Sequence, residues 1–110
     1  IERGTGRSKL KTESVGYLLA LLASPEPRQR ALAADILGSL GPAASSAIPT
    51  LRRALSDSDP RVRASAALAL GGVAVAIPEI VEDLQRALLD PSEDVRLSSR
   101  AALGRLASAR

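Results

Sequence analysis

Apolar residues recur along the chain at helical spacing, and short turns rich in proline or glycine interrupt the pattern. The stretch Asp57 to Gly71 shows it best: Asp59 can cap a helix, Pro60 occupies the first helical position, and an alanine-rich helix with one apolar face follows. The pattern predicts six helices, over residues of about 13–23, 27–40, 46–56, 60–73, 77–89 and 93–107. Residues expected in the core include Val15, Leu18, Leu22, Ile48, Leu51, Leu55, Val62, Ala66, Ala67, Leu70, Val73, Leu84 and Leu88.

The pattern repeats every 33 residues along the chain. Gly38, Gly71 and Gly104 fall in register, and so do three arginines. A fixed period in this range indicates stacked helical repeats, and short connections make neighbouring helices antiparallel. The sequence therefore predicts an all-α fold, an α-solenoid of three helical hairpins. The domain covers residues 12–110, with repeats of about 12–41, 42–74 and 75–110.

Composition excludes several classes of function. The chain has no histidine and no cysteine, so imidazole bases, thiol nucleophiles, disulfides and thiolate metal sites are all excluded. The net charge is +3, and residues 1–11 account for all of it. This segment contains two glycines and no periodicity, and we interpret it as a flexible basic arm. We expect a solvated linker, with contact to an acidic partner or nucleic acid as the alternative.

Targeting signals are absent from the sequence pattern. No apolar run approaches the roughly 20 residues of a membrane span, and we find no signal-peptide pattern. The chain begins at Ile1 without methionine, which indicates a processed form or a fragment. We therefore expect a cytoplasmic location and no membrane contact.

The second and third repeats carry a specific residue pattern. In the second it reads Ile48-Pro-Thr-Leu51, Leu55, Asp57, Asp59-Pro60, Val62-Arg63, Ala66-Ala67 and Ala69-Leu70-Gly71. This resembles a HEAT-like repeat, most closely the short bacterial and archaeal type also found in phycobilisome lyase subunits. The resemblance spans roughly residues 13–107. It is specific for the fold and not for function, because this fold hosts many functions.

The resemblance also implies an inter-repeat ladder. In such repeats an aspartate in the turn and an arginine six residues later usually form a ladder along the stack. The first repeat has Ser24 before Arg30, so we expect its rung to lack the carboxylate. We assign these residues a structural role. The pairs that match the spacing are Asp57 with Arg63 and Asp90 with Arg96.

No catalytic constellation is visible in the sequence. The only lysines lie in the arm, so a Ser–Lys pair is not expected in the repeats. Glu79 and Asp83 lie one turn apart, and we expect a solvated acidic surface there, with weak cation binding as the alternative. We expect Arg52, Arg53 and Arg86 to be solvated on the convex side. The sequence predicts no metal, no cofactor and no enzymatic activity.

The candidate partner-binding surface follows from the expected architecture. The second helix of each hairpin lines the concave face, whose small and mixed surface suits a protein or peptide. We therefore expect a non-enzymatic protein–protein interaction module. Alternatives are a chaperone or lyase-type role in chromophore attachment, implied by the resemblance, and nucleic-acid contact through the arm. The candidate concave residues are Leu32, Asp35, Ser65, Leu68, Ser98, Ala101 and Arg105.

The first helix carries apolar residues outside its inward stripe. Tyr17, Leu19 and Leu21 extend around the helix, and exposed contiguous apolar surface usually marks an interface. We expect this end to be covered by a second copy in a homodimer, by another chain or by a preceding segment. The alternative is packing within the chain. We expect the sixth helix to close the stack towards solvent through Ser98, Ser99, Arg100, Arg105 and Ser108.

Overall fold

The structure is a computed structural model of the chain, and it describes residues 13–73 and 77–108. Within these ranges the chain forms helices and turns, with no strand. The all-α prediction is therefore confirmed. After a helix over residues 13–21 come α2 (Pro27–Leu40), the 3₁₀ helix η1 (Gly41–Ala47), α3 (Ile48–Ala54), α4 (Pro60–Val73), α5 (Pro78–Ala87) and α6 (Glu93–Ser108).

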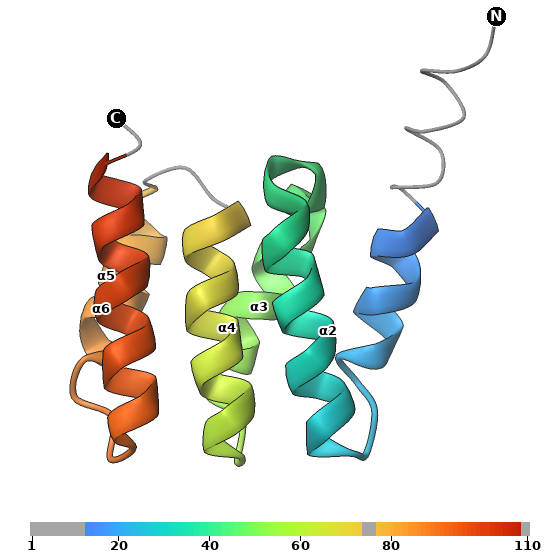
Figure 1. Cartoon of the computed structure of the whole chain (residues 1–110), viewed down its shortest axis with the longest axis horizontal. Coiled ribbons are helices and arrows are strands. Elements are labelled where there is room, and N and C mark those ends of the chain that lie inside the picture. The colour runs from blue at the N-terminus through green and yellow to red at the C-terminus, as the bar shows by residue number, and fades with distance from the viewer. Residues whose placement is uncertain (1–12, 74–76, 109–110) are drawn as a thin grey trace, which may run out of the picture.

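The helices form two layers (Figure 1). α2, α4 and α6 run in the same direction side by side, and α4 packs against both of its neighbours. α3 and α5 run the opposite way behind them, and the helix over residues 13–21 begins the stack beside α2. We call α2, α4 and α6 the B helices. This arrangement is the predicted stack of antiparallel hairpins.

Helix boundaries follow local chemistry. α4 begins at Pro60 as predicted, and Asp59 caps it, because its Oδ1 accepts the Arg61 N–H at 2.8 Å. α2 ends at Leu40 because Gly41 has φ of 67°, a left-handed conformation that glycine adopts without strain. The chain does not then enter an irregular turn, as the sequence suggested. It continues as η1, which buries Ala44 and Ala47, so α3 begins later than expected.

The prediction that no apolar run approaches the length of a membrane span is wrong when the run is judged by its length and composition alone. Pro27–Ala54 forms a helical run of 28 residues that is long and apolar enough for a span. In the structure Gly41 divides this run, and its two arms, α2 and α3, lie in different layers. A span needs about 20 residues of continuous helix, whereas α2 has 14 and α3 has 7. The run forms a hairpin of the core.

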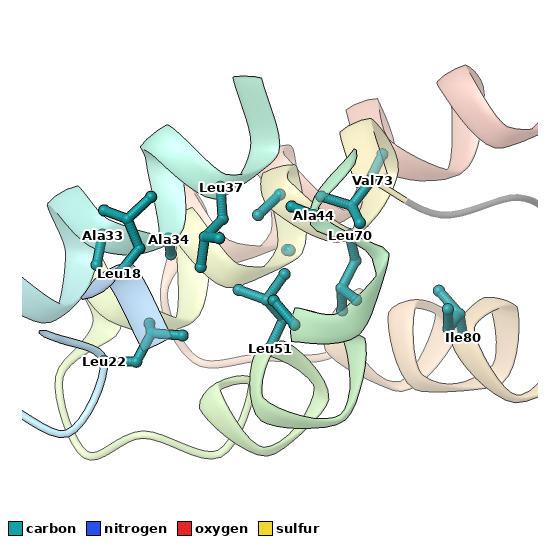
Figure 2. Packing of buried hydrophobic residues seen from close by; sticks show 14 of the residues in the cluster. Leu18, Leu22, Ala33, Ala34, Leu37, Ala44, Leu51, Leu70, Val73 and Ile80 are labelled. Carbon is teal, nitrogen blue, oxygen red and sulfur yellow. The ribbon is translucent and has the colours of Figure 1, made fainter. Parts of the chain in front are cut away.

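The core lies between the two layers (Figure 2). Leu18 and Leu22 of the first helix contact the cluster that continues through Leu37, Leu51 and Leu70. The expected core residues that are indeed buried are Val15, Leu18, Leu22, Leu51, Val62, Ala66, Ala67, Leu70, Val73 and Leu84.

Three expected core residues are only partly buried: Ile48, Leu55 and Leu88. Ile48 begins α3, and Leu55 and Leu88 directly follow the last residues of α3 and α5. At these three positions the neighbouring layer leaves part of the side chain exposed. The 33-residue register therefore identified the right faces but overestimated burial at the helix ends.

Small residues set the distance between adjacent B helices. A Cβ atom at Gly38 would lie 2.8 Å from Cα of Ala69, and one at Gly71 would lie 2.8 Å from Cα of Ala102. Both contacts are too close for any side chain, so these two positions require glycine. Gly104 occupies the equivalent position on α6, but no atom of the described residues lies within 4 Å of a Cβ built there.

The sixth helix only partly matches the expectation that it faces solvent. Arg100, Arg105 and Ser108 are exposed. Ser99, however, is fully buried, and its Oγ has no hydrogen-bond partner within the described residues. The prediction for Ser99 is wrong because this residue stands in register with the buried Ala33 and Ala66.

We predict opposite effects of alanine at two glycines that share one register position. Gly71→Ala should destabilise the fold by more than about 1 kcal/mol, because the new Cβ overlaps Ala102 and forces overpacking. Gly104→Ala should stabilise it by up to about 1 kcal/mol, because alanine is the better helix former and the site is open. Urea unfolding of both variants measures the difference. Equal effects would contradict the close α4–α6 contact.

Candidate protein-binding site

Two bidentate arginine–aspartate pairs join the three repeats. Arg30 donates from Nε and Nη2 to Asp57 Oδ2 and Oδ1 at 2.9 and 3.0 Å. Arg63 makes the same two bonds to Asp90 at 2.8 and 3.0 Å. All four side chains are largely buried, between 11 and 17% exposed. Bidentate pairs of this kind fix orientation as well as adding energy, so they hold each repeat in register with the next.

The same arginines also hold their own turns. Nη1 of Arg30 donates to the Ser24 carbonyl oxygen at 2.8 Å, and Nη1 of Arg63 donates to the Asp57 carbonyl oxygen at 2.8 Å. The spacing of six residues therefore reflects a bond to the backbone of the turn, and the carboxylate partner comes from the following repeat. The expectation that the first rung lacks a carboxylate is wrong, because Arg30 reaches Asp57 across the stack.

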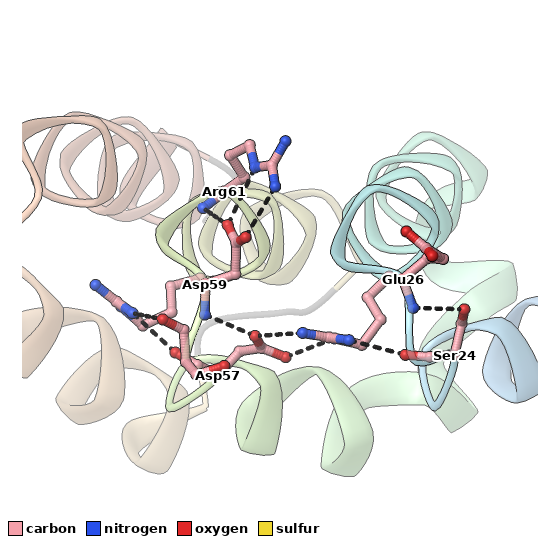
Figure 3. Close-up of polar contacts among 8 residues, drawn as sticks. Ser24, Glu26, Asp57, Asp59 and Arg61 are labelled. Atoms are coloured by element: carbon pink, nitrogen blue, oxygen red, sulfur yellow. Dashed lines mark hydrogen bonds and ion pairs between the residues drawn. The ribbon is translucent and has the colours of Figure 1, made fainter.

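Ser24 performs only the local part of this arrangement (Figure 3). Its Oγ accepts the Glu26 N–H at 3.1 Å, as Asp57 Oδ1 accepts the Asp59 N–H at 2.9 Å. In the third repeat Asp90 Oδ1 accepts the Ser92 N–H at 2.9 Å. A hydroxyl and a carboxylate both stabilise such a turn. Only the carboxylate can also bind the guanidinium of a neighbouring repeat through two oxygens and an opposite charge.

The ladder lowers the pKa of its carboxyl groups. Hydrogen bonds from Arg63 hold the pKa of Asp90 below its usual value, against the opposing effect of burial. Burial raises the pKa of Asp57, but bonds from Arg30 and from the Asp59 N–H outweigh it, and the net pKa is lowered. The pKa of Asp59 falls to about 2, chiefly because of the hydrogen bond from the Arg61 side chain. These carboxylates remain charged well below neutral pH.

The acidic surface expected at Glu79 and Asp83 is neutralised at Asp83. The side chain of Asp83 is only 10% exposed, and it accepts Arg52 Nε at 2.5 Å and Nη2 of Arg86. Arg52 and Arg86 are therefore ion-paired, contrary to the expectation that they are simply solvated. Among the described residues no group of three or more acidic side chains converges on one point.

A groove lies on the B-helix layer, between α2, α4 and α6. It has a volume of about 500 Å³, and its wall includes the kink after α2 at Gly41 and Pro42. Gly38 and Gly72 contribute backbone atoms to the wall of the groove. They lie so close together that a Cβ at Gly72 would be 2.6 Å from the Gly38 carbonyl oxygen. The side chains that line it are Asp35, Ser39, Leu68 and Arg105, together with Pro42 and Ala69.

The seven candidate concave residues all lie on the B helices, but the structure divides them. Asp35, Leu68 and Arg105 line the groove together. The others lie outside it on the same three helices; Leu32 is exposed at 57%, and the remainder are Ser65, Ser98 and Ala101. The sequence reasoning missed the contribution of the kink and of Ala69. The Gly41-Pro42 pair was the available signal, since it marked a bend beside this face.

The first helix leaves one aromatic side chain in the open. Tyr17 is 66% exposed, and it lines a shallow apolar groove with Leu18 and with Ile36 of α2. Leu19 and Leu21 are partly buried and pack against the core of their own chain. Internal packing thus accounts for the two leucines and not for Tyr17. Self-association through this end stays a prediction centred on Tyr17.

These features define the class of protein: parallel B helices, a second antiparallel layer and a repeated arginine–aspartate ladder make an α-solenoid. The family model for HEAT repeats matches residues 16–104. The chain belongs to the HEAT repeat family, as the residue pattern indicated. The comparison with curated proteins found no match.

The basic arm and its expected contacts lie outside the described residues. Nucleic-acid binding through residues 1–11 therefore stays a prediction. A role in chromophore attachment also stays a prediction, since it rests on the resemblance to lyase-type repeats.

We predict that Arg63 is coupled more strongly to the side chain of Asp90 than to that of Asp57. In a double-mutant cycle, Arg63→Gln with Asp90→Asn should give a coupling of about 1–3 kcal/mol, as charge-assisted bonds do. The same cycle with Asp57→Asn should give a smaller coupling, because Arg63 bonds the backbone carbonyl oxygen of Asp57 and feels its carboxylate only through charge. Arg53→Ala is the control and should cost little, because within residues 13–73 and 77–108 its guanidinium bonds the Thr50 hydroxyl alone. Equal coupling in both cycles would rule out this geometry.

We also predict a pH dependence of stability that depends on the ladder. The folded pKa values of Asp57 and Asp90 are lowered, so their contribution is complete above the unfolded pKa of about 3.9 and is lost as pH falls through the folded values. Urea unfolding at pH 7 and pH 3 compares the wild type with Asp57→Asn/Asp90→Asn. The wild-type advantage should shrink at pH 3; an advantage independent of pH would contradict the assignment.

Proposed function

We propose that the chain is a non-enzymatic protein-interaction module that binds a peptide segment of a partner in the groove of the B-helix layer. The observation that carries the proposal is the groove itself, where Asp35, Leu68 and Arg105 from three helices surround one depression. HEAT repeats commonly act as protein-interaction scaffolds, and membership of that family supports the proposal. The proposal includes the cytoplasmic location expected from the sequence.

The chemistry of the groove suits an extended segment with one apolar side chain. Leu68 is 41% exposed, and Pro42 adds a second apolar contact beside it. A partner side chain that covers them removes apolar surface from water. Asp35 and Arg105 offer one charge of each sign, so a partner carrying opposite charges would bind in a defined direction.

The composition supports binding over catalysis. A groove of this kind needs a general base or an activated nucleophile to perform chemistry, and the chain has neither histidine nor cysteine. The other candidates that line the groove, Asp35 and Ser39, do not form a pair, because the Ser39 hydroxyl donates to the Ile36 carbonyl oxygen at 2.7 Å. The two ionisable side chains of the groove, an aspartate and an arginine, are groups that orient a ligand through charge.

We predict that Leu68→Glu weakens partner binding at least about 30-fold while Leu89→Glu leaves it intact. Leu68 lies in the groove, whereas Leu89 is 85% exposed and does not line it. Truncation of a central apolar contact typically costs about 2 kcal/mol, or roughly 30-fold in affinity. Affinity capture from extracts of the source, quantified by mass spectrometry, compares wild type, Leu68→Glu and Leu89→Glu. Thermal melts verify folding, and a partner captured equally by all three would contradict the proposal.

A further inference from the structure

α6 is the last helix of the described residues. It carries the groups that α2 and α4 use to hold the repeat after them, and none of residues 13–73 and 77–108 covers these groups. We define the C-terminal edge as the face of α6 formed by Arg96, Leu97, Arg100 and Gly104. In α2 and α4 the positions in register with Arg96 and Gly104 face the following repeat. Figure 1 shows α6 at one end of the B-helix row.

Arg96 is held in the same way as the two arginines of the ladder. Its Nη1 donates to the Asp90 carbonyl oxygen at 2.8 Å, as Nη1 of Arg63 donates to the Asp57 carbonyl oxygen at 2.8 Å. In Arg63 this arrangement leaves Nε and Nη2 free to bind the next aspartate. Nε and Nη2 of Arg96 have no acceptor within residues 13–73 and 77–108. A guanidinium is therefore positioned for a carboxylate that the described chain does not supply.

Gly104 is a second, independent indication. Gly38 and Gly71 must be glycine because the next helix crosses them, with Cα of an alanine 2.8 Å from a Cβ position. Nothing within the described residues crosses Gly104. Glycine weakens a helix relative to alanine, so the described fold gives no reason for glycine here. A helix packed across α6 would supply that reason.

A second copy does not fit this edge. The opposite end of the stack would have to offer an aspartate where Asp57 and Asp90 stand, and it has Ser24. It would also have to offer an alanine where Ala69 and Ala102 meet the glycines, and it has Ile36, which is 38% exposed. Both groups that would bind the C-terminal edge are thus missing from the chain's own first repeat.

We propose that the C-terminal edge docks a helical hairpin of a partner protein, with an aspartate in its turn for Arg96 and an alanine or glycine across Gly104. Arg100 restricts which hairpins can fit against this edge, because it stands in register with Ala34 and Ala67, which are buried in the internal interfaces. Two arginines on one face favour an acidic hairpin, and the longer side chain selects against a repeat like those of this chain. The surface is separate from the groove of the proposed function.

The test gives the chain the two groups that its first repeat lacks. The Ser24→Asp/Ile36→Ala variant should associate head to tail at least about tenfold more tightly than wild type, the range expected for a charge-assisted bidentate pair. Because such a contact does not close, the oligomers should lengthen with concentration. Sedimentation measures the association, and circular dichroism verifies folding. If Ile36→Ala prevents folding, Ser24→Asp alone serves as the probe.

Further changes in that variant identify the edge. Arg96→Gln should weaken association at least about tenfold, whereas Arg28→Gln, an exposed arginine on α2, should leave it unchanged. Gly104→Ala should weaken association although the monomer becomes more stable, which separates docking from folding. Arg100→Ala should tighten association.

The proposal is overturned if the double variant does not associate, or if its association is insensitive to Arg96→Gln and Gly104→Ala. Wild-type association of equal strength through this edge would also overturn it, since a second copy would then be the occupant. If Arg100→Ala weakens association, Arg100 does not select against repeats like those of this chain, and that part of the proposal is overturned. The proposed function is tested at Leu68, which lines the groove and is not part of the C-terminal edge. A negative result with Leu68→Glu therefore does not affect the test of this edge.

Discussion

The close approach of the three B helices is the constraint on which the rest of the structure depends. Glycine on one helix meets the backbone of alanine on the next, so α2, α4 and α6 pack nearer to each other than larger side chains would allow. A single hairpin cannot bury its apolar face, and stacking supplies the missing surface. Because the B helices are so close to one another, longer side chains of the second layer, such as Leu51 and Leu84, fill the space between the two layers.

The arginine–aspartate ladder depends on that packing. Arg30 and Arg63 reach the following repeat only because the turns that precede the B helices lie next to one another along the same side of the stack. Each arginine also bonds a carbonyl of its own turn, which orients its guanidinium towards the partner carboxylate. Side chains that are already ordered lose less conformational entropy when they pair. The ladder therefore adds register and direction to a stack whose main stabilisation is apolar burial.

The two ends of the stack differ in chemistry. The first repeat presents Tyr17 and Ile36, which are apolar, and Ser24, which carries no charge. The last helix presents Arg96 and Arg100 beside an open glycine. An internally repetitive chain would join to itself indefinitely if its ends were complementary. Ser24 and Ile36 stand where the later repeats have an aspartate and an alanine, so the first repeat does not complement the edge formed by Arg96 and Gly104, although it keeps the local turn bond.

The sequence by itself determined the all-α class, the register of the repeats and the start of α4 at Pro60, because helical periodicity and capping are local properties. It also identified most of the buried face, including Leu51, Leu70 and Leu84. It could not predict η1, the neutralisation of Asp83 or the burial of Ser99, since each depends on what the neighbouring layer supplies. The groove has the same origin. Asp35, Leu68 and Arg105 are far apart in the sequence, and only the stacking of α2, α4 and α6 brings them together. The spacing within one repeat predicted that Arg63 pairs with Asp57. In the structure its guanidinium binds the carboxylate of Asp90 and only the backbone carbonyl of Asp57. The distance between adjacent repeats decides which carboxylate a guanidinium can reach, and that distance is set by the tertiary structure.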